Sequence, residues 1–386
     1  MASFFESTFD FNKGEPNIGI IAPEGAKELA EKVDYFLVKM YNEDRKKVNF
    51  KTKEVDSFLI NTKCPRFTTG DGKAIINETV RGKDVYIVTD VGNYSCTYSM
   101  FGMEVPMSPD DHYADLKRIL SAIAGKANRI TLIMPMLYGG RQHRRNARES
   151  LDCAMMLQEM ESMGVRDIIT FDAHDPRVQN AIPLMGFDNF FPTYQILKAL
   201  LGKYPDTKFD KDHFMVVSPD EGAMSRNIYY ASELGLDLGM FYKRRDYSTI
   251  INGRNPIVAH EYIGNSVKNK DVFVADDIIA TGDSILRLAS DLKKDGANRI
   301  FISSTFALFT EGIERFNKAY KEGLFTALLS TNLTYLKPEL KKVDWFIEAD
   351  MSKFIAYIIA ASAQDKSFSV LLAPHEKISD LIKKNQ

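Results

Sequence analysis

Short apolar runs rich in β-forming residues alternate with amphipathic stretches along most of the chain. The expected strands are 85–90, 129–137, 167–172, 214–219, 238–243, 271–276 and 299–307, and the expected helices are 112–125, 149–164, 224–234 and 284–295. Strands this apolar are buried on both faces, and strands that alternate with helices form parallel sheets. Because 386 residues exceed one ordinary domain, we expect an α/β protein of two domains.

The charge and the cysteine content narrow the class of protein. Lys and Arg number 50 and Asp and Glu 52, so the chain is not a nucleic-acid or membrane binder by net charge. The three cysteines form no CxxC pair, which argues against a disulfide framework or a zinc site and favours a reducing compartment. The N-terminal residues do not resemble a signal peptide, and the apolar run 354–363 is about half as long as a membrane span. We therefore expect a cytoplasmic enzyme or binding protein.

The stretch VFVADDIIATGDS, residues 272–284, joins a buried strand to two adjacent acids and a small polar loop. Asp283 or Ser284 is expected to cap the helix that follows. A small loop that opens a helix presents backbone N–H groups to an anion, and the helix dipole favours a phosphate there. Asp276 and Asp277 would repel that phosphate but suit sugar hydroxyls, bound directly or through Mg²⁺. The alternative is a capped turn with two surface acids.

Other strand ends also carry charged residues, and ligands of open parallel sheets gather at the carboxyl ends of strands. Residues 134–149 include a dense group of basic residues that suits a polyphosphate ligand. The alternative is that these residues only form a solvated, charged surface. The members of the group are Arg141, His143, Arg144, Arg145 and Arg148. Asp172 and His174 follow a strand and suit a metal or a metal-bound phosphate, although a lone histidine is more often structural. Two further strand ends carry Asp220 with Glu221, and Lys243 with Arg244 and Arg245.

Taken in order, these motifs resemble the ribose-phosphate diphosphokinase (PRPP synthetase) family over about residues 18–372. The family pattern consists of an FSDGE-type loop, RGxDV, RQD, DLH, SPDxGG, KRR and DD…TGGT. The chain has RFTTGDG (66–72), RGKDV (81–85), RQH (141–143), DAH (172–174), SPDEGA (218–223), KRR (243–245) and DDIIATGDS (276–284). The last motif alone also resembles type I phosphoribosyltransferases, so the ordered set carries the resemblance.

The resemblance implies two tandem type I phosphoribosyltransferase-like domains, each a mainly parallel sheet flanked by helices. The first is expected to span 18–187, to include the C-terminal segment 350–386 and to bind ATP. The second is expected to span 188–349 and to bind ribose 5-phosphate, with the active site between the two domains. The resemblance also implies a homo-oligomer, a dimer or higher, in which the ATP loop comes from a neighbouring subunit.

The implied reaction transfers the diphosphoryl group of Mg-ATP to the anomeric hydroxyl of ribose 5-phosphate, giving 5-phosphoribosyl 1-diphosphate and AMP. The residues implied for ATP are Phe67, Thr69, Gly70, Asp71, Arg141, Gln142 and His143. His174 and Asp220 are implied as Mg²⁺ ligands, and Lys243 and Arg245 as the catalytic cations at the transferring phosphates. The residues implied for ribose 5-phosphate are Asp276, Asp277, Ala280, Thr281, Gly282, Asp283 and Ser284.

Several positions depart from the family pattern, so the chain is expected to be a divergent member. Thr69 and His143 replace aspartates, Ala223 replaces a glycine, and Phe306 stands where a histidine often follows the strand. The polar segment 42–57 is expected to be a solvated loop or an exposed helix, and 92–111 a long, turn-rich connection. Both lie near regions that the resemblance links to subunit contacts and regulation. A catalytically silent PRPP-synthetase-associated regulatory protein is the main alternative. A phosphoribosyltransferase is the second alternative, and it leaves the first half of the chain unexplained.

Overall fold

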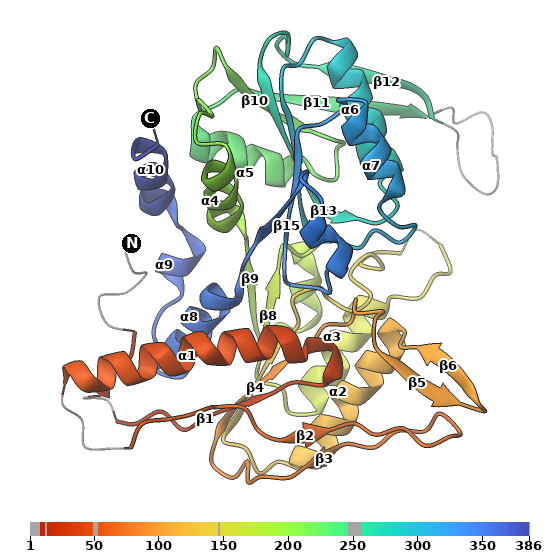
Figure 1. The fold of residues 1–386 in the computed structure, drawn as a ribbon. Helices are drawn as coiled ribbons and strands as arrows, with labels where there is room; N and C mark the ends of the chain where they lie inside the picture. The colour runs from red at the N-terminus through yellow and green to blue at the C-terminus, as the bar shows by residue number, and fades with distance from the viewer. Residues whose placement is uncertain (1–7, 12–13, 49–52, 146, 246–256, 386) are drawn as a thin grey trace. The chain divides into compact units, whose positions relative to one another are not determined.

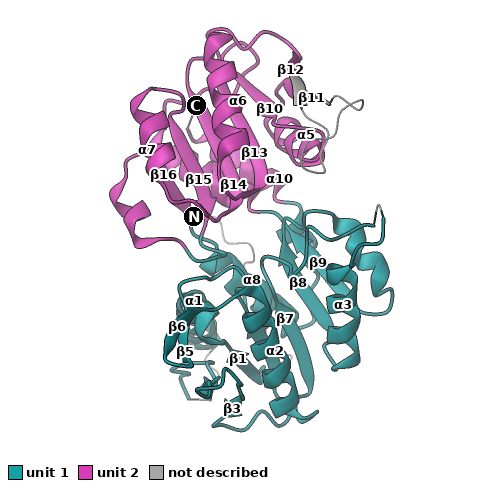
Figure 2. Cartoon of the chain, turned by 90° about the vertical axis from the view of Figure 1, so that its right-hand side faces the viewer, with its two compact units in different colours: residues 1–191, 332–335, 350–373 teal, residues 192–331, 336–349, 374–386 magenta. Residues whose placement is uncertain are grey.

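The structure is a computed structural model that describes residues 8–11, 14–48, 53–145, 147–245 and 257–385 (Figure 1). Side chains are described for all of these except 243–245 and 257–260. The chain forms two compact units (Figure 2). Unit 1 contains residues 1–191, 332–335 and 350–373, and unit 2 contains residues 192–331, 336–349 and 374–386.

Unit 1 is built on a five-stranded sheet in which all neighbouring strands are parallel. The strands, in spatial order, are β1 (Ile18–Ile21), β4 (Asp84–Val88), β7 (Arg129–Ile133), β8 (Asp167–Phe171) and β9 (Gly186–Phe190). The helices are α1 (Lys27–Lys47), α2 (Pro109–Ile123), α3 (Asp152–Ser162), α8 (Ser352–Ser362) and α9 (Ser369–Leu372). Two antiparallel pairs stand outside this sheet: β2 (Thr62–Lys63) with β3 (Ile75–Ile76), and β5 (Thr97–Met100) with β6 (Met103–Pro106).

Helix α2 shows how the sequence determines one of these elements. Ser108 and Asp111 form a capping box, and Pro109 occupies the first helical position, an arrangement that fixes a helix N-terminus. The predicted apolar face, which contains Leu116 and Ile119, is buried in the unit 1 core against side chains of α3 and the sheet. The helix therefore begins three residues before the predicted start and buries the predicted face.

Unit 2 is built on a seven-stranded sheet that is parallel except for one edge strand. The strands, in spatial order, are β12 (Ile257–Ile263), β11 (Leu238–Arg245), β10 (Phe214–Ser218), β13 (Asp271–Ile279), β14 (Ile300–Ala307), β15 (Ala327–Thr331) and β16 (Phe346–Ala349). Strand β12 pairs antiparallel with β11. The helices are α4 (Thr193–Lys203), α5 (Met224–Leu234), α6 (Asp283–Lys294), α7 (Glu314–Lys321) and α10 (His375–Lys383).

Strand β13 is buried on both faces, as its apolar sequence predicts. Val272 and Val274 belong to one apolar cluster, which includes side chains of α6 and α7. Phe273 and Ala275 belong to a second cluster, which includes side chains of α4 and α5. Because successive side chains of a strand point to opposite faces, helices cover both faces of the sheet at this strand. The prediction of mainly parallel sheets flanked by helices is confirmed in both units.

The structure corrects some details of the predicted organisation. Residues 374–386, expected with the first domain, belong to unit 2, where α10 packs against α4 and α5. Residues 332–335, expected in the second domain, belong to unit 1. The segment 92–111, expected to be a long, turn-rich connection, contains the β5–β6 hairpin and the start of α2. The run 354–363 lies almost entirely in α8, a buried helix of unit 1.

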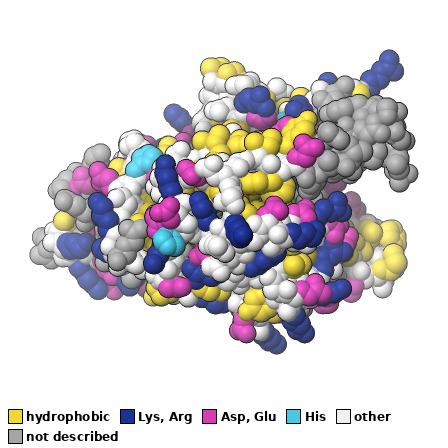
Figure 3. Space-filling model, turned by 90° about the horizontal axis from the view of Figure 1, so that it is seen from above, with side chains coloured by type: hydrophobic (Ala, Val, Ile, Leu, Met, Phe, Trp, Pro, Cys, Tyr) yellow, Lys and Arg dark blue, Asp and Glu magenta, His cyan; other side chains and the backbone are white. Residues whose placement is uncertain are grey.

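The surface agrees with the balanced composition. On the face shown in Figure 3, Lys and Arg side chains are interspersed with Asp and Glu. Among the described residues, no helix is both long enough and apolar enough to span a membrane.

Candidate active site

The two adjacent acids lie near the carboxyl end of β13, in the interior of the unit 2 sheet. Asp276 Oδ1 accepts the N–H of Asp277 at 2.9 Å, and Asp277 Oδ1 accepts the N–H of Ile278 at 2.9 Å. Asp277 is buried, whereas Asp276 is partly exposed. Arg226 on α5 approaches Asp276, with 3.8 Å between Nη1 and Oδ1. Of the two acids, Asp276 is therefore the one whose side chain is accessible from solvent.

The surroundings of Asp276 disfavour its ionised form. Burial raises the pKa of Asp276 well above its usual value, and the Asp277 carboxylate raises this pKa further. The charge of Arg226 lowers the pKa of Asp276, whereas the Asp220 carboxylate raises it. Like charges in a poorly solvated position repel one another. The position therefore favours a hydrogen-bond donor or a cation beside Asp276.

The predicted phosphate loop, Ala280–Ser284, leads directly from β13 into α6. Gly282 has φ of +90° and is the N-cap of α6, and Asp283 is the first helical residue. A Cβ atom at position 282 would lie 2.2 Å from Phe316 Cζ, so the position requires glycine. The prediction that Asp283 or Ser284 caps the helix is wrong. The N–H of Asp283 instead donates to the Thr281 hydroxyl at 3.3 Å, and the glycine cap leaves the helix terminus suited to an anion.

Asp220 lies between β10 and α5, in a loop that is fixed to the neighbouring strand. Its Oδ1 accepts the N–H of Ala223 at 3.2 Å, and its carbonyl accepts the Ser218 hydroxyl at 2.8 Å. Asn227 on α5 donates to the Ala275 carbonyl at 2.8 Å and accepts the Ala275 N–H at 3.1 Å. This bridge joins α5 to β13, which brings Asp220 close enough to act on the pKa of Asp276.

Lys243 and Arg245 lie at the end of β11, which is next to β10 in the same sheet. Lys243 is opposite His260 in the register with β12, and the register shifts between Arg244 and Arg245. The side chains of Lys243 and Arg245 lie outside the described part of the chain, so their catalytic role stays a prediction.

The predicted ATP loop of unit 1, Phe67–Asp71, forms a tight hairpin. The N–H of Phe67 donates to the Asp71 carbonyl at 2.7 Å, and the Thr69 hydroxyl donates to Asp71 Oδ2 at 2.9 Å. Gly70 has φ of +93°, a conformation that glycine adopts without strain. The Phe67 ring is 53% exposed. The loop therefore presents an aromatic face and a carboxylate to solvent.

The base of this loop is held by a buried ion pair. Arg66, which precedes Phe67, has a side chain only 6% exposed and pairs with Asp115 of α2. Its Cζ lies 5.3 Å from the centroid of the Tyr98 ring. The N–H of Phe101, in the β5–β6 hairpin, donates to the Thr68 carbonyl at 2.9 Å. The hairpin formed by 97–106 thus supports the loop.

The remaining predicted residues of unit 1 follow β7 and β8. Arg141 and Gln142 are exposed, and His143 is partly buried, with its Nε2 3.6 Å from Asp175 Oδ2. The ring centroids of His143 and His174 are 5.3 Å apart. Arg177 lowers the pKa of Asp175 to about 2 through their hydrogen bonds, so Asp175 is ionised beside His143. The structure thus brings the RQH and DAH motifs together.

The described residues contain no group of three or more His, Cys, Asp or Glu side chains arranged to hold a metal ion. Magnesium is commonly bound by one or two carboxylates, and waters and substrate phosphates complete its coordination. Asp220, a carboxylate, fits such a partial site. His174 offers a nitrogen atom, which a hard cation prefers less than oxygen.

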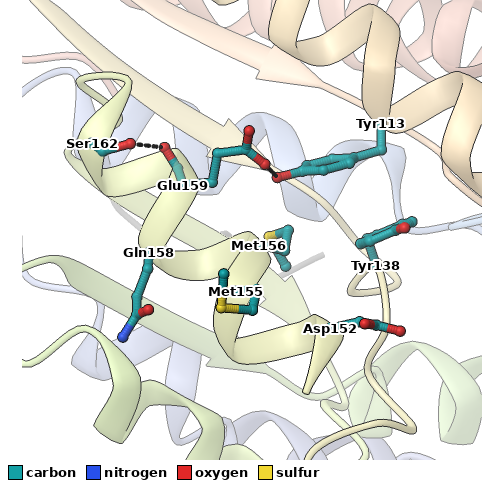
Figure 4. Close-up of a pocket in the computed structure, with 8 residues that line it drawn as sticks. All are labelled: Tyr113, Tyr138, Asp152, Met155, Met156, Gln158, Glu159 and Ser162. Atoms are coloured by element: carbon teal, nitrogen blue, oxygen red, sulfur yellow. Dashed lines mark hydrogen bonds between the residues drawn. The ribbon is translucent and has the colours of Figure 1, made fainter. Parts of the chain in front are cut away.

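A pocket of about 520 Å³ on unit 1 contains none of the predicted site residues (Figure 4). The stacked rings of Tyr113 and Tyr138, with centroids 4.5 Å apart, form part of its lining. Tyr113 donates to Glu159, and Tyr138 donates to Asp110 at 2.6 Å. The polar groups of these rings are therefore already paired within the protein.

Three residues that support the site were not found from the sequence: Arg226, Asn227 and Arg315. Arg226 and Asn227 lie in the first turns of α5 and contact β13, which is about 50 residues away in the chain. Arg315, on α7, pairs with Asp283 of the predicted phosphate loop. Nothing in the local sequence of α5 or α7 marks these residues, because their partners lie in other segments.

Two protein families match the chain in succession. The N-terminal domain of ribose phosphate pyrophosphokinase matches residues 18–164, and the phosphoribosyl transferase domain matches residues 189–323. A ribose-phosphate pyrophosphokinase of Shewanella oneidensis is 28% identical over 313 residues, which cover 80% of this chain and 89% of that protein. A ribose-phosphate pyrophosphokinase of Corynebacterium ammoniagenes is 26% identical over 359 residues, which cover 92% of this chain and 97% of that protein.

The fold agrees with these sequence matches. The crystal structure of phosphoribosylpyrophosphate synthetase from Mycobacterium smegmatis aligns with a TM-score of 0.69 and 20% sequence identity, covering 90% of this chain and 99% of that one. Two tandem phosphoribosyltransferase-type domains in the same order are therefore present in this protein. With both domains matched in sequence, and with similar proteins aligned over most of their lengths, the chain belongs to the ribose-phosphate pyrophosphokinase family.

Proposed function

We propose that this protein transfers the diphosphoryl group of ATP to the anomeric hydroxyl of ribose 5-phosphate. The anomeric oxygen forms a bond to the β-phosphorus of ATP. The bond from that phosphorus to the oxygen that bridges to the α-phosphorus breaks, and AMP leaves with the bridging oxygen. The hydroxyl proton is released to solvent, and the product is 5-phosphoribosyl 1-diphosphate.

The observation that carries this proposal is the arrangement at the end of β13. Asp276 and Asp277 are followed at once by a glycine-capped loop that opens α6. The acids suit the hydroxyls of a ribose, and the helix terminus suits its 5-phosphate. The raised pKa of Asp276 supports this assignment, because a hydroxyl that donates to the carboxylate stabilises its ionised form.

The proposal assigns the nucleotide to residues of unit 1. The exposed ring of Phe67 offers a surface on which a purine base can stack. Asp71 and the Thr69 hydroxyl offer polar contacts beside it. Arg141 and Gln142 are exposed and suit the phosphates and the ribose of ATP. His143 stands where the family pattern has an acid, and its contact with Asp175 keeps a carboxylate nearby.

Magnesium is proposed as the metal that accompanies ATP. Asp220 and His174 are the residues proposed to hold it, Asp220 being the better match in chemistry. Bound Mg²⁺ would neutralise charge on the phosphates of ATP. Lys243 and Arg245 are proposed to stabilise the charge that develops on the transferring group, because phosphoryl-type transfer depends on positioning and charge neutralisation.

The experiment that tests the proposal measures AMP and ADP released from Mg-ATP by the purified protein, with and without ribose 5-phosphate. We expect AMP that depends on the sugar, and no ADP. As a matched control, 2-deoxyribose 5-phosphate keeps the phosphate and removes one hydroxyl that the acids are proposed to bind. It should therefore support much slower AMP release.

The other outcomes contradict the proposal in different ways. Formation of ADP would indicate transfer of the γ-phosphoryl group only. Absence of AMP together with binding of ribose 5-phosphate would indicate a catalytically silent, regulatory member of the family. Equal rates with both sugars would place the sugar hydroxyls away from Asp276 and Asp277.

A further inference from the structure

Asp283 places a carboxylate in the loop that we propose to hold the 5-phosphate of the sugar. It stands where the family pattern DD…TGGT has its second glycine, and it is the first residue of α6. An acid at a helix N-terminus gains from the helix dipole. It also has the same sign of charge as the phosphate and occupies the region of positive potential that the phosphate would use. A loop of this composition therefore binds phosphate well only if a nearby cation compensates for Asp283.

Arg315 supplies that cation from a different element. It lies on α7, 32 residues after Asp283 in the chain, and its Nη1 pairs with Asp283 Oδ1. The same Nη1 donates to the carbonyl of Thr281 at 3.5 Å. The guanidinium thus contacts two residues of the Ala280–Ser284 loop. Its Nη2 pairs with Glu311, so the cation is shared between two acids.

The position of Arg315 is not explained by the stability of its helix. Arg315 lies in the first turn of α7, where the helix dipole disfavours a cation. Arg315 is partly exposed and the two acids that it pairs with, Asp283 and Glu311, are exposed. Such surface ion pairs contribute little to folding. The next residue, Phe316, packs so closely on Gly282 that no Cβ fits there. The start of α7 therefore provides both a charge and an apolar contact to one loop.

We propose that Arg315 is a positioning residue for the sugar phosphate. Its guanidinium neutralises Asp283 and holds the Thr281 carbonyl on the side of the loop that faces α7. The N-terminus of α6 then remains the anion-binding feature of the loop, although the loop contains an acid. This inference deepens the proposed function and rests on its assignment of ribose 5-phosphate to unit 2.

The test compares kcat and KM for ribose 5-phosphate in the wild type, Arg315→Ala, Arg315→Lys and the double variant Asp283→Gly/Arg315→Ala. We expect Arg315→Ala to raise this KM by about 10- to 100-fold, the size of effect that follows loss of a charge-assisted contact. We expect kcat and the KM for ATP to change little, because the loop lies at the 5-phosphate and not at the anomeric centre. Arg315→Lys keeps the charge and should recover part of the loss.

The double variant separates charge compensation from structural support. With Asp283 replaced by glycine, no carboxylate remains to be neutralised, so the KM should return most of the way toward the wild-type value. Lys318→Ala is the matched control. Lys318 lies on the same helix, is exposed, and pairs at 3.9 Å with Glu322, a residue outside the loop. Its removal deletes the same charge from α7 and should leave the KM unchanged.

Two results with an active wild type would overturn the inference. The first is an Arg315→Ala variant with the same KM as Lys318→Ala. The second is a loss of kcat that the double variant does not restore, which would make Arg315 purely structural.

Failure of the proposed function is recognised separately. If the wild type releases no AMP, the same variants are compared by calorimetric titration with ribose 5-phosphate. Weaker binding by Arg315→Ala, restored in the double variant, would support the inference even though the reaction is wrong. No binding of the sugar phosphate by the wild type would remove both the function and the inference.

Discussion

Replacing Asp90 by asparagine is expected to remove a pH dependence from the stability of unit 1. Asp90 follows β4 and is 5% exposed. Its Oδ1 accepts the N–H of Gly92 at 2.9 Å and the hydroxyl of Thr334 at 3.0 Å, and its Oδ2 accepts the N–H of Tyr335 at 2.8 Å. Burial raises the pKa of Asp90 to about 7, although these hydrogen bonds favour the ionised form.

The size and sign of the effect follow from the two pKa values. The ordinary pKa is 3.8, so between about pH 4 and pH 7 the unfolded chain is ionised at this residue while the folded protein keeps a proton. The free energy of unfolding of unit 1 therefore falls as the pH rises through this window. Above the window both states are ionised, so Asp90 adds no further pH dependence and the full loss of stability persists. A difference of about 3 pH units, at about 1.4 kcal/mol each, gives a total loss of at most about 4 kcal/mol.

Urea unfolding at a series of pH values from 5 to 8 measures this slope. Far-UV circular dichroism follows both units, and the fluorescence of Trp345, the single tryptophan, follows unit 2 as an internal reference. Because two-state behaviour is a property of small single domains, the transitions of the two units are fitted separately. In Asp90→Asn the amide faces the N–H of Tyr335, which costs about 1–3 kcal/mol at every pH, but the slope between pH 5 and 7 should flatten.

A second variant checks the cause of the slope. Thr334→Val removes one hydrogen bond that favours the Asp90 carboxylate, so it should raise the pKa of Asp90 further and extend the decline in stability above pH 7. The reasoning fails if the wild type and Asp90→Asn show the same slope, or if unit 1 becomes more stable as the pH rises from 5 to 7.

Three further predictions concern the site. Asp276→Ala should raise the KM for ribose 5-phosphate by about 10-fold or more, because it removes an acceptor of the sugar hydroxyls; steady-state kinetics that show an unchanged KM would place the sugar elsewhere. Lys243→Ala should lower kcat by about 100-fold or more with an unchanged circular dichroism spectrum, and wild-type turnover by this variant would refute its catalytic assignment. Gly282→Ala should impair binding of ribose 5-phosphate in calorimetry, because φ is +90° and the new Cβ would lie 2.2 Å from Phe316 Cζ. If the added Phe316→Ala change gives no recovery of binding, the steric explanation is wrong.

The elements with a strong local signal were predictable. The seven predicted strands correspond to β4, β7, β8, β10, β11, β13 and β14. The strands missed in the two main sheets were β12, which is seven residues long, and β1, β9, β15 and β16, which are four or five residues long. The short strands of the two antiparallel pairs, β2, β3, β5 and β6, were also missed. Both β9 (GFDNF) and β16 (FIEA) are sheet-edge strands that include an acid. A short run with a charged residue lacks the continuous apolar pattern by which buried strands are recognised.

The residues of the candidate site also divide into those that could be predicted from the local sequence and those that could not. Asp276, Asp277 and the loop after them could be predicted because strand, acids and helix start are consecutive in sequence. The predicted N-cap of α6 was wrong by one to two residues. Gly282, with a positive φ, is the N-cap, and the Thr281 hydroxyl accepts the N–H of Asp283. Arg315 could not be predicted, because its partner Asp283 is 32 residues away and periodicity describes only neighbours along one element.

The return of the chain to unit 1 has a consequence for how the protein is synthesised. Helix α8 packs against α1, and its Ser362 hydroxyl accepts a hydrogen bond from the Tyr86 hydroxyl of β4 at 3.1 Å. The Phe354 ring of α8 contacts the rings of Phe171 and Phe190.

About 160 residues separate the end of the first segment of unit 1 from α8, so at about 5–20 residues per second α8 is translated roughly 10–30 s later. During that interval the nascent sheet exposes the apolar surface that α8 later covers. A truncation after residue 191 would keep that surface exposed permanently, which makes an isolated N-terminal fragment prone to aggregation and a ribosome-bound one a candidate for chaperone capture.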